Sequence, residues 1–361
     1  MGIEKIDKNF AEYKSVTIGG RRAYVIPSPC FSLHDVFFDE KENCFLRMDS
    51  KVASSVSEGV EFLNHQTAGG RLCFSTDSKT LEIEVAYKSL DAMPHMPLTG
   101  SSGFTLFEIT EQGEEFISNL TPTFANIYGF KAAANVSGGT MKKYVLYFPL
   151  YQNVSSLVIM LDEAARVQKY NPYRDIAPIL YYGSSITQGG CASRPDNCYQ
   201  GIVCKRNRID FINLGFSGNG KAEPNMVDYL AKIDCSLFVC DYDHNAPTAE
   251  YLEATHYALY ERYRKARPDT PILFISKPDW KRDVRGEQRL NIIRNTYLKA
   301  KRQGDKNVYF LSGKTFYGKR SHTDFAVDGC HPTDYGFQMM ADKIYKKMIT
   351  IDKKLGRGNN D

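Results

Sequence analysis

Several features that define large classes of proteins are missing from this sequence. No apolar run in its 361 residues approaches the ~18 residues that a membrane-spanning helix needs. None of the nine cysteines stands in a Cys-x-x-Cys pair, and the Gly-x-x-x-x-Gly-Lys-Ser/Thr pattern of phosphate-binding loops does not occur. Basic and acidic residues nearly cancel, 46 against 42, so the formal net charge is only +4. These absences argue against a membrane protein, a zinc protein, a P-loop nucleotide-binding protein and a nucleic-acid-binding protein.

The composition otherwise favours a large folded core, because 42% of the residues are hydrophobic. Residues 1–8 are too charged for a signal peptide, so we expect a cytoplasmic protein as written, or a periplasmic or secreted one if an export signal has been removed. The odd number of cysteines argues against a disulfide framework, although the spacing of Cys191 and Cys198 leaves a local bridge open. The oligomeric state cannot be deduced from the sequence.

Residues 1–165 show the pattern of an all-β domain. From Leu81 to Lys88 apolar and polar residues alternate, which is typical of a half-buried strand. Two further β-type runs lie at 144–148 and 157–161, and glycine-rich turn signals separate the runs. No helical period of useful length is present. We therefore predict a β-sandwich of jelly-roll type, acting as an accessory domain.

After a predicted linker at 166–177, the region 178–355 alternates apolar runs with helical patterns. The predicted strands are 179–182, 211–214, 237–240, 272–275 and 308–311. The predicted helices are 197–206, 224–233, 248–266, 283–303 and 332–349. Unbroken apolar strands that alternate with helices predict an α/β fold, in which helices cover both faces of a parallel sheet. Functional sites of such sheets gather at the carboxyl ends of the strands.

Ser185 follows the first of these strands, in the sequence Gly183-Ser184-Ser185-Ile186-Thr187-Gln188-Gly189. Small residues at a strand end allow the backbone to turn sharply and expose a hydroxyl. Far along the chain, Asp328 stands three residues before His331, a spacing at which a carboxylate can orient an imidazole. The three residues are candidates for nucleophilic acyl transfer. A capping role for Ser185 and structural roles for Asp328 and His331 are the alternatives.

Two more polar segments follow the second and third strands. Glycines at 215, 218 and 220 let the backbone approach a ligand and point N–H groups at it. Asn245 ends the segment Asp241-Tyr242-Asp243-His244-Asn245, and its amide can donate a hydrogen bond to a developing oxyanion. Asp241 and His244 also suggest metal ligands, but their spacing matches no strong ligand pattern. A flexible turn and a polar loop are the plainer interpretations.

Taken in order, these segments resemble the four characteristic blocks of the SGNH/GDSL hydrolases over about residues 178–350. The resemblance implies a flavodoxin-like, three-layer domain with Ser185 as nucleophile and with His331 and Asp328 as its partners. It implies an oxyanion hole made of the backbone N–H groups of Ser185 and Gly218 and the side chain of Asn245. It implies no cofactor and no metal. Ser184 stands where the family usually has an acid, and the segment before Asn245 lacks the family's leading glycine.

A β-rich domain ahead of such a hydrolase resembles bacterial carbohydrate esterases. We therefore expect a serine esterase that removes a small acyl group, acetyl above all, from a glycan or small-molecule ester, without a nucleic-acid or membrane partner. Four aromatic residues of the first half either flank a sugar or form sandwich core: Phe62, Phe104, Phe107 and Tyr128. A lipid ester hydrolase, and a non-catalytic carbohydrate-binding protein on a hydrolase scaffold, are the alternatives that remain open.

Overall fold

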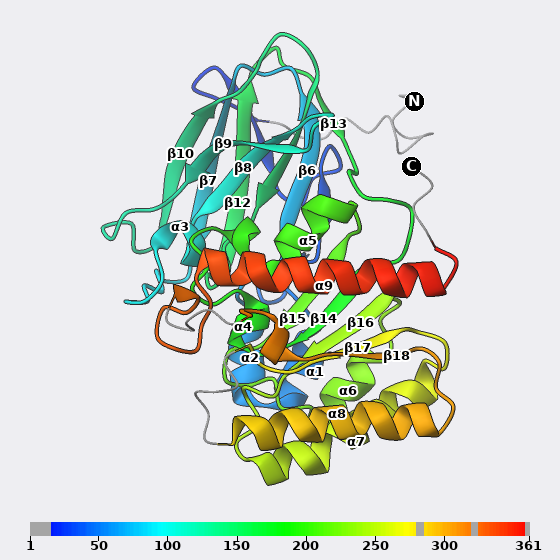
Figure 1. Cartoon of the computed structure of the whole chain (residues 1–361). Coiled ribbons are helices and arrows are strands. Elements are labelled where there is room, and N and C mark those ends of the chain that lie inside the picture. Colours follow the sequence, from blue (N-terminus) through cyan, green and yellow to red (C-terminus); the bar gives the residue numbers. More distant parts are fainter. Residues whose placement is uncertain (1–15, 279–284, 319–323, 358–361) are drawn as a thin grey trace, which may run out of the picture.

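The protein has a β-rich half and an α/β half, which lie one above the other in Figure 1. The structure is a computed structural model, and it describes residues 16–278, 285–318 and 324–357. The strands of the β-rich half come from the earlier part of the chain, whereas the α/β half is formed by the later part together with two short helices from residues 50–64. The order of strands and helices along the chain therefore follows the two patterns predicted from the sequence.

Two antiparallel sheets form the β-rich half. The first has the strand order β1–β2–β12–β7–β10, and the second has the order β13–β6–β11–β8–β9 with β3 paired to β6. The first sheet consists of β1 (Val16–Ile18), β2 (Arg21–Val25), β7 (Thr80–Tyr87), β10 (Gly129–Asn135) and β12 (Val154–Asp162). The second consists of β3 (Ser32–His34), β6 (Arg71–Thr76), β8 (Phe104–Ile109), β9 (Glu114–Leu120), β11 (Lys142–Tyr147) and β13 (Val167–Lys169). A separate hairpin is made of β4 (Phe37–Asp39) and β5 (Cys44–Leu46).

The two sheets face each other across a shared apolar core, which confirms the predicted sandwich. In β7, Leu81, Ile83 and Val85 are buried, whereas the residues between them are half-buried. These side chains belong to one cluster with Phe74 and Tyr144 of the second sheet. Successive side chains of a strand point to opposite faces of the sheet. The alternation in the sequence of β7 therefore places its apolar side chains on the face that packs against the second sheet.

The α/β half contains a five-stranded parallel sheet with the order β15–β14–β16–β17–β18, which is the flavodoxin-like order. Its strands are β14 (Ile179–Gly183), β15 (Phe211–Gly215), β16 (Leu237–Asp241), β17 (Ile272–Ile275) and β18 (Val308–Leu311). Its longer helices are α5 (Tyr199–Asn207), α6 (Pro224–Leu230), α7 (Ala249–Ala266), α8 (Gly286–Arg302) and α9 (Asp334–Lys354). Short helical turns are α4 (Ser185–Gln188), η3 (Pro195–Asn197) and η4 (Gly313–Thr315). All these strands and longer helices were predicted, although residues 283 and 284 of the predicted fourth helix lie outside the described residues.

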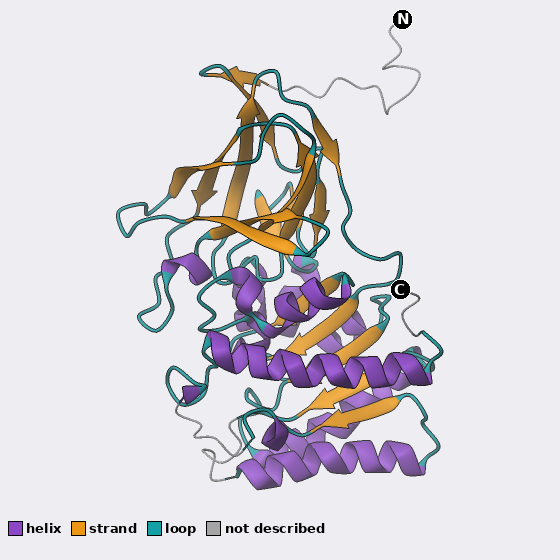
Figure 2. Ribbon diagram, turned by 45° about the horizontal axis from the view of Figure 1, so that its top comes forward, coloured by secondary structure: helices purple, strands orange, loops and turns teal. Residues whose placement is uncertain are grey.

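Helices cover both faces of the parallel sheet (Figure 2). Ile179 and Tyr181 of β14 lie in an apolar cluster with α5 and α9, whereas Leu180 and Tyr182 lie in a second cluster with α6, α7 and α8. The strand β14 is therefore buried on both sides, which explains why its sequence is apolar without alternation. The arrowheads of these strands in Figure 2 point the same way, so their carboxyl ends meet at one edge of the sheet.

Three helices occur in the first half, where the sequence shows no helical period of useful length. They are α1 (Ser50–Val56), α2 (Glu58–Asn64) and α3 (Leu98–Ser101). The side chains of Asp49 and Ser57 cap α1 and α2 by accepting hydrogen bonds from N–H groups three residues further on. Ala53 and Val60 are buried in the cluster that covers one face of the parallel sheet. Helices of seven residues are too short for their period to stand out in a sequence.

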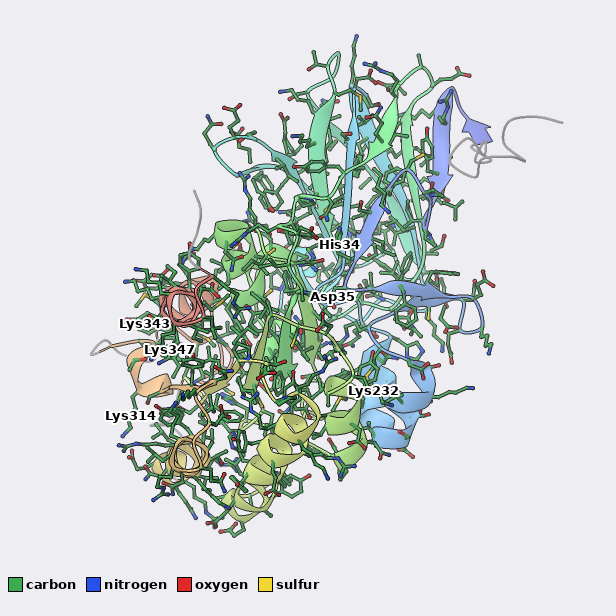
Figure 3. All side chains as sticks on the ribbon, turned by 90° about the vertical axis from the view of Figure 1, so that its right-hand side faces the viewer. His34, Asp35, Lys232, Lys314, Lys343 and Lys347 are labelled. Carbon is green, nitrogen blue, oxygen red and sulfur yellow. The ribbon has the colours of Figure 1, made fainter. Side chains whose placement is uncertain are left out.

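The β-rich half also covers the free edge of β15, the outermost strand of the parallel sheet. Asp35 accepts a hydrogen bond from the Asn213 N–H (2.9 Å), and Arg71 Nη2 donates to the Phe211 carbonyl (2.7 Å). Without such partners an edge strand leaves its outer backbone groups unpaired. Burial raises the pKa of Asp35 to about 7, although Arg71 and the Asn213 N–H oppose the shift. Figure 3 shows His34 and Asp35 at the junction between the two halves.

The predicted limits of the domains, 1–165, 166–177 and 178–355, stay a prediction. Within the predicted linker, Val167–Lys169 forms β13 and pairs with β6 of the second sheet. The helices α1 and α2 belong to the first region by sequence but bury their apolar sides in the α/β half. Contacts therefore cross the proposed boundary in several places.

Candidate active site

Ser185 lies at the point where β14 ends and α4 begins. The Ser184 hydroxyl caps α4 by accepting a hydrogen bond from the Ile186 N–H (3.2 Å). Gly183 has no room for a side chain, because a Cβ there would lie 1.9 Å from Asp241 Oδ1. The sharp turn places Ser185 at the carboxyl edge of the sheet with 7% of its surface exposed.

His331 and Asp328 lie on a tight turn before α9. Backbone hydrogen bonds from Val327 N–H to the His331 carbonyl (2.9 Å) and from Thr333 N–H to the Phe325 carbonyl (2.8 Å) close the turn. Asp328 Oδ1 accepts the His331 N–H (2.8 Å), and Asp328 Oδ2 lies 2.7 Å from His331 Nδ1. The backbone bond and the ring bond together fix the imidazole relative to the carboxylate.

The structure brings this pair together with Ser185. His331 Nε2 lies 2.7 Å from Ser185 Oγ, so the hydroxyl, the imidazole and the carboxylate form one hydrogen-bonded chain. Partial burial opposes ionisation of Asp328, yet the hydrogen bonds from the backbone and ring of His331 hold its pKa well below the usual range. An ionised carboxylate favours the imidazole tautomer with its proton on Nδ1, which leaves Nε2 to accept the serine proton.

Gly218 lies in the loop that follows β15, and the side chain of Asn245 is hydrogen-bonded to the same loop. The Phe216 carbonyl accepts hydrogen bonds from Asn245 Nδ2 (2.7 Å) and from the N–H groups of Asn219 (2.9 Å) and Gly220 (3.0 Å). Gly218 has a φ of 70°, a left-handed conformation that favours glycine. Among the hydrogen bonds between described residues, none uses the Gly218 N–H or the second amide proton of Asn245. Both donors can therefore serve an acceptor on a ligand.

Asp241, at the end of β16, forms a buried support beside the serine turn. The sequence indicated Asp241 only as a candidate metal ligand, and the described residues contain no group of three or more side chains that could hold a metal ion. Instead, its carboxyl accepts hydrogen bonds from the Thr187 hydroxyl and from Tyr199 (3.2 Å). Burial raises the pKa of Asp241 to about 8, and the charge of Asp243 adds to the shift. No local spacing in the sequence indicates these contacts.

We expect Asp241→Asn to flatten the pH dependence of stability between about pH 4 and pH 8. In this window the unfolded chain has lost the proton of Asp241, whose usual pKa is 3.8, whereas the folded chain retains it up to about pH 8. Since the folded state binds more protons, wild-type stability falls as the pH rises through the window, and asparagine removes that contribution. Thermal unfolding midpoints of both proteins measured from pH 4 to pH 8 test this. A difference between them that stays constant with pH would contradict it.

Two further imidazoles lie near His331. His95 is exposed on the segment between β7 and α3, and its ring centroid lies 6.0 Å from that of His331. His244 is partly buried, with Nδ1 3.4 Å from the sulfur of Cys330. Burial and nearby cations hold the pKa of His244 well below its usual value, so this ring is neutral and adds no charge beside His331. The β-rich half therefore contributes at least one polar side chain, His95, to the surroundings of the site.

The four aromatic residues considered for sugar contact fall into two groups. Phe104 and Phe107 are buried, which fits sandwich core, whereas Phe62 and Tyr128 are 63% and 74% exposed. The Tyr128 carbonyl accepts the N–H of the last residue of β7 (2.8 Å). The backbone of Tyr128 is therefore bonded to the residue that immediately precedes the segment carrying His95.

Two findings concern questions that the sequence left open. Cys191 and Cys198 both carry free thiols, so they form no bridge in this structure. Within the described ranges, no helix has the length and apolar character required to cross a membrane.

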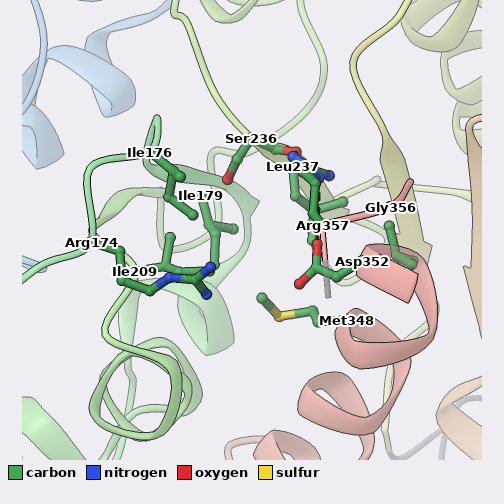
Figure 4. A pocket seen from close by; sticks show the side chains of 11 residues that line it. Arg174, Ile176, Ile179, Ile209, Ser236, Leu237, Met348, Asp352, Gly356 and Arg357 are labelled. Atoms are coloured by element: carbon green, nitrogen blue, oxygen red, sulfur yellow. Dashed lines mark hydrogen bonds and ion pairs between the residues drawn. The ribbon is translucent and has the colours of Figure 1, made fainter. Parts of the chain in front are cut away.

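A hollow of about 340 Å³ lies at the amino end of the parallel sheet (Figure 4). Ile179 and Leu237, the first residues of β14 and β16, lie on its wall with Met348 of α9. Arg174 and Asp352 also line it. Because β14 leads from this hollow to the serine turn, the hollow is separated from the hydrogen-bonded chain at the carboxyl edge by the length of the sheet.

Comparisons with known proteins identify the family. Residues 177–350 match the GDSL-like lipase/acylhydrolase family, and residues 24–167 match the N-terminal region of SGNH-hydrolase-type esterases. The comparison with curated proteins gives no match.

Among solved structures, similar folds span nearly the whole chain. A protein described as a GDSL-like lipase from Bacteroides ovatus is 26% identical with a TM-score of 0.82, and the match covers 92% of this chain and 98% of that one. A salicylyl-acyltransferase from a tetracycline biosynthetic pathway is 17% identical with a TM-score of 0.76, covering 93% and 98%. An acetyl xylan esterase from the rumen bacterium Butyrivibrio proteoclasticus is 13% identical with a TM-score of 0.62, covering 94% and 100%.

The two family matches lie on either side of the predicted linker and account for both halves of the fold. The resemblance to SGNH/GDSL hydrolases is therefore confirmed, and so is the prediction of an ester hydrolase. Residues 177–350 match the GDSL-like lipase/acylhydrolase family, the region before them matches the N-terminus of SGNH-type esterases, and the protein is a carboxylic ester hydrolase of the SGNH type.

Proposed function

We propose that the protein is a serine esterase in which Ser185 is the nucleophile, His331 is the general base and then the general acid, and Asp328 orients His331. The 2.7 Å contact between Ser185 Oγ and His331 Nε2 carries this proposal. A second 2.7 Å contact, between His331 Nδ1 and Asp328 Oδ2, supports it. This order of hydroxyl, imidazole and carboxylate is the arrangement that activates a serine for acyl transfer.

The reaction proceeds through an acyl-enzyme. His331 accepts the hydroxyl proton while Ser185 Oγ bonds to the ester carbonyl carbon. The bond from that carbon to the alcohol oxygen then breaks, and the alcohol leaves with the proton from His331. A water molecule gives a proton to His331 and attacks the acyl group, and the bond to Oγ breaks as His331 returns the proton to Ser185.

The proposed oxyanion hole consists of the backbone N–H groups of Ser185 and Gly218 and the side-chain amide of Asn245. The open left-handed turn at Gly218 supports this assignment, because no atom of the described residues beyond its two chain neighbours lies within 4 Å of the position of an added Cβ. The bond from Asn245 Nδ2 to the Phe216 carbonyl supports it as well, since it fixes the amide and leaves its second proton free. Donors fixed in advance stabilise negative charge without reorganising during the reaction.

Asn245→Ala should lower kcat by about 10²- to 10³-fold with little change in KM, because it removes one oxyanion donor. Hydrolysis of p-nitrophenyl acetate measures both parameters. Asn225→Ala is the matched control, since the amide of Asn225 is bonded to Ser55 at an exposed position, and its kcat should stay at the wild-type value. A kcat for Asn245→Ala within about threefold of wild type would contradict the assignment.

We propose an acetylated carbohydrate as the substrate class. An exposed imidazole at His95, whose ring centroid lies 6.0 Å from that of His331, supports it, since an imidazole can donate or accept hydrogen bonds with sugar hydroxyls. Acetate release from a panel of acetylated sugars and xylan, compared with p-nitrophenyl esters of increasing acyl length, tests this class. We expect the highest kcat/KM for acetyl esters and acetate release from at least one glycan. Turnover that rises with acyl length and is absent on every glycan would favour a lipid ester hydrolase instead.

A further inference from the structure

We infer that Arg47, a residue of the β-rich half, positions the loop that carries one proposed oxyanion donor, Gly218, and that is hydrogen-bonded to another, Asn245. This loop, residues 215–220, is called the oxyanion loop below. The inference rests on the proposed function, because it assumes that Gly218 and Asn245 contact the oxyanion. It follows that the β-rich half is a working part of the active site and not a separable accessory domain.

The guanidinium of Arg47 reaches the oxyanion loop directly. Arg47 is only 3% exposed, and its Nη1 donates to the Gly215 carbonyl (2.6 Å) and to the Asn213 carbonyl (3.2 Å). Its central carbon lies 4.6 Å from the centroid of the Phe216 ring, so the charge also contacts the aromatic face. Burial lowers the pKa of Arg47 to about 10, with nearby Asp35 opposing the shift, so the group is charged at neutral pH. Hydrogen bonds from a charged donor are stronger than those between neutral groups.

Arg47 is itself held in place by the short helix α2. Its Nη2 donates to the Leu63 carbonyl in α2 (2.6 Å). The side chain of Asn64 accepts the N–H of Met48 (2.8 Å) and donates to the Met48 carbonyl (2.8 Å). The residue after Arg47 is therefore bonded on both sides to α2, and the guanidinium is a fixed contact between α2 and the oxyanion loop.

The next residue of the loop connects Arg47 to the donors. The Phe216 N–H donates to the Gly183 carbonyl at the end of β14 (3.0 Å), and the Phe216 carbonyl accepts the Asn245 amide (2.7 Å). Gly218 follows two residues later, inside the turn that Gly220 closes on the same carbonyl (3.0 Å). A shift of Gly215 and Phe216 would therefore move both proposed donors relative to Ser185.

Two more contacts, one from Gln66 and one from α2, reach the same loop. Gln66 Oε1 accepts the Gln188 amide (2.6 Å), and Gln188 Oε1 accepts the Ser217 N–H (3.0 Å). The backbone of Gly59 in α2 lies so close to Asn219 that a Cβ at Gly59 would be 2.1 Å from its Oδ1. Residues 47–66 thus contact the loop near its start, through Gln188 at its middle, and near its end.

Arg71 provides a matched control within the same interface. It is also a buried arginine of the β-rich half, and it donates to a carbonyl of the same strand, Phe211 (2.7 Å). Phe211 is the first residue of β15, whereas Gly215 is the last and leads into the oxyanion loop. Both arginines cover the edge of β15, but only Arg47 contacts the loop.

The experiment compares Arg47→Met with Arg71→Met, below the unfolding temperature of both. Loss of Arg47 should lower kcat for p-nitrophenyl acetate by about 10- to 100-fold with KM within about threefold, because a displacement near 1 Å can cost about 10²-fold in rate. The rate at which a fluorophosphonate labels Ser185 should fall in parallel, since its phosphoryl oxygen occupies the oxyanion hole. Loss of Arg71 should lower the melting temperature but leave kcat within about threefold of wild type.

If a methionine variant does not fold, the less disruptive substitutions Arg47→Lys and Arg71→Lys allow the same comparison. Lysine keeps the charge but lacks the planar fork, so kcat should still fall for Arg47→Lys and not for Arg71→Lys. Equal effects of the two arginines on kcat and on the labelling rate, in either pair, would overturn the positioning role. Failure of the fluorophosphonate to label Ser185 in the wild-type protein would instead refute the proposed function.

Discussion

Ser185→Ala should reduce the hydrolysis of p-nitrophenyl acetate by at least about 10⁴-fold. Ser185 Oγ is the hydroxyl that lies 2.7 Å from His331 Nε2, and alanine leaves the imidazole without a nucleophile to activate. The substitution removes one oxygen atom from a 7% exposed side chain, so the fold should tolerate it. Steady-state rates of the two purified proteins, with melting temperatures measured in parallel, test the prediction.

Ser184→Ala is the matched control, because it removes a hydroxyl from the adjacent buried position. The Ser184 hydroxyl caps α4 through the Ile186 N–H, so its loss should cost about 1 kcal/mol of stability and leave activity within about tenfold of wild type. Equal rates for wild type and Ser185→Ala would end the proposed mechanism. That result would favour a carbohydrate-binding role on a hydrolase scaffold, the non-catalytic alternative that the sequence left open.

The α/β half could be predicted from local patterns because its strands are buried on both faces. Ile272–Ile275 is an unbroken apolar run, and the structure confirms its limits. Thr248 and Thr333 cap α7 and α9 through their hydroxyls, at positions where the helical patterns begin. In such a sheet the order of strands brings the segments after β14, β15 and β16 to one edge. This is why residues far apart in the sequence could be predicted to share a site.

The contacts between the halves could not be predicted in the same way. Arg47 and Gly215 are 168 positions apart, and Gln66 and Gln188 are 122 positions apart. Patterns of alternation and helical period describe residues within one element, so they do not indicate which carbonyl a distant arginine will reach. The short helices α1 and α2 add to the difficulty, because they bury Ala53 and Val60 in the other half and not in their own sandwich. The sequence therefore indicated the proposed donors, Gly218 and Asn245, without indicating what holds them.

Asp328→Asn should lower kcat by about 10³- to 10⁴-fold while KM changes little. Asp328 Oδ1 accepts backbone N–H groups from Cys330 (2.9 Å) and His331 (2.8 Å), and asparagine can keep both bonds with its carbonyl oxygen. Its amide nitrogen must then face His331 Nδ1, in the place of the oxygen that now lies 2.7 Å away. An amide donor there favours the tautomer with its proton on Nε2, which cannot accept the proton of Ser185. The pH–rate profile and kcat of the variant measure the effect.

Asp334→Asn separates this catalytic effect from a loss of stability. Asp334 lies three residues after His331 and accepts hydrogen bonds from the Ser193 N–H (2.8 Å) and the Asn197 amide (3.0 Å), so it fixes the start of α9 without touching the imidazole. Its variant should unfold at a lower temperature but keep kcat within about threefold of wild type. Comparable losses of kcat in the two variants would reduce Asp328 to a structural carboxylate. Because asparagine has no carboxyl group to ionise, raising the pH should not restore kcat in the Asp328→Asn variant.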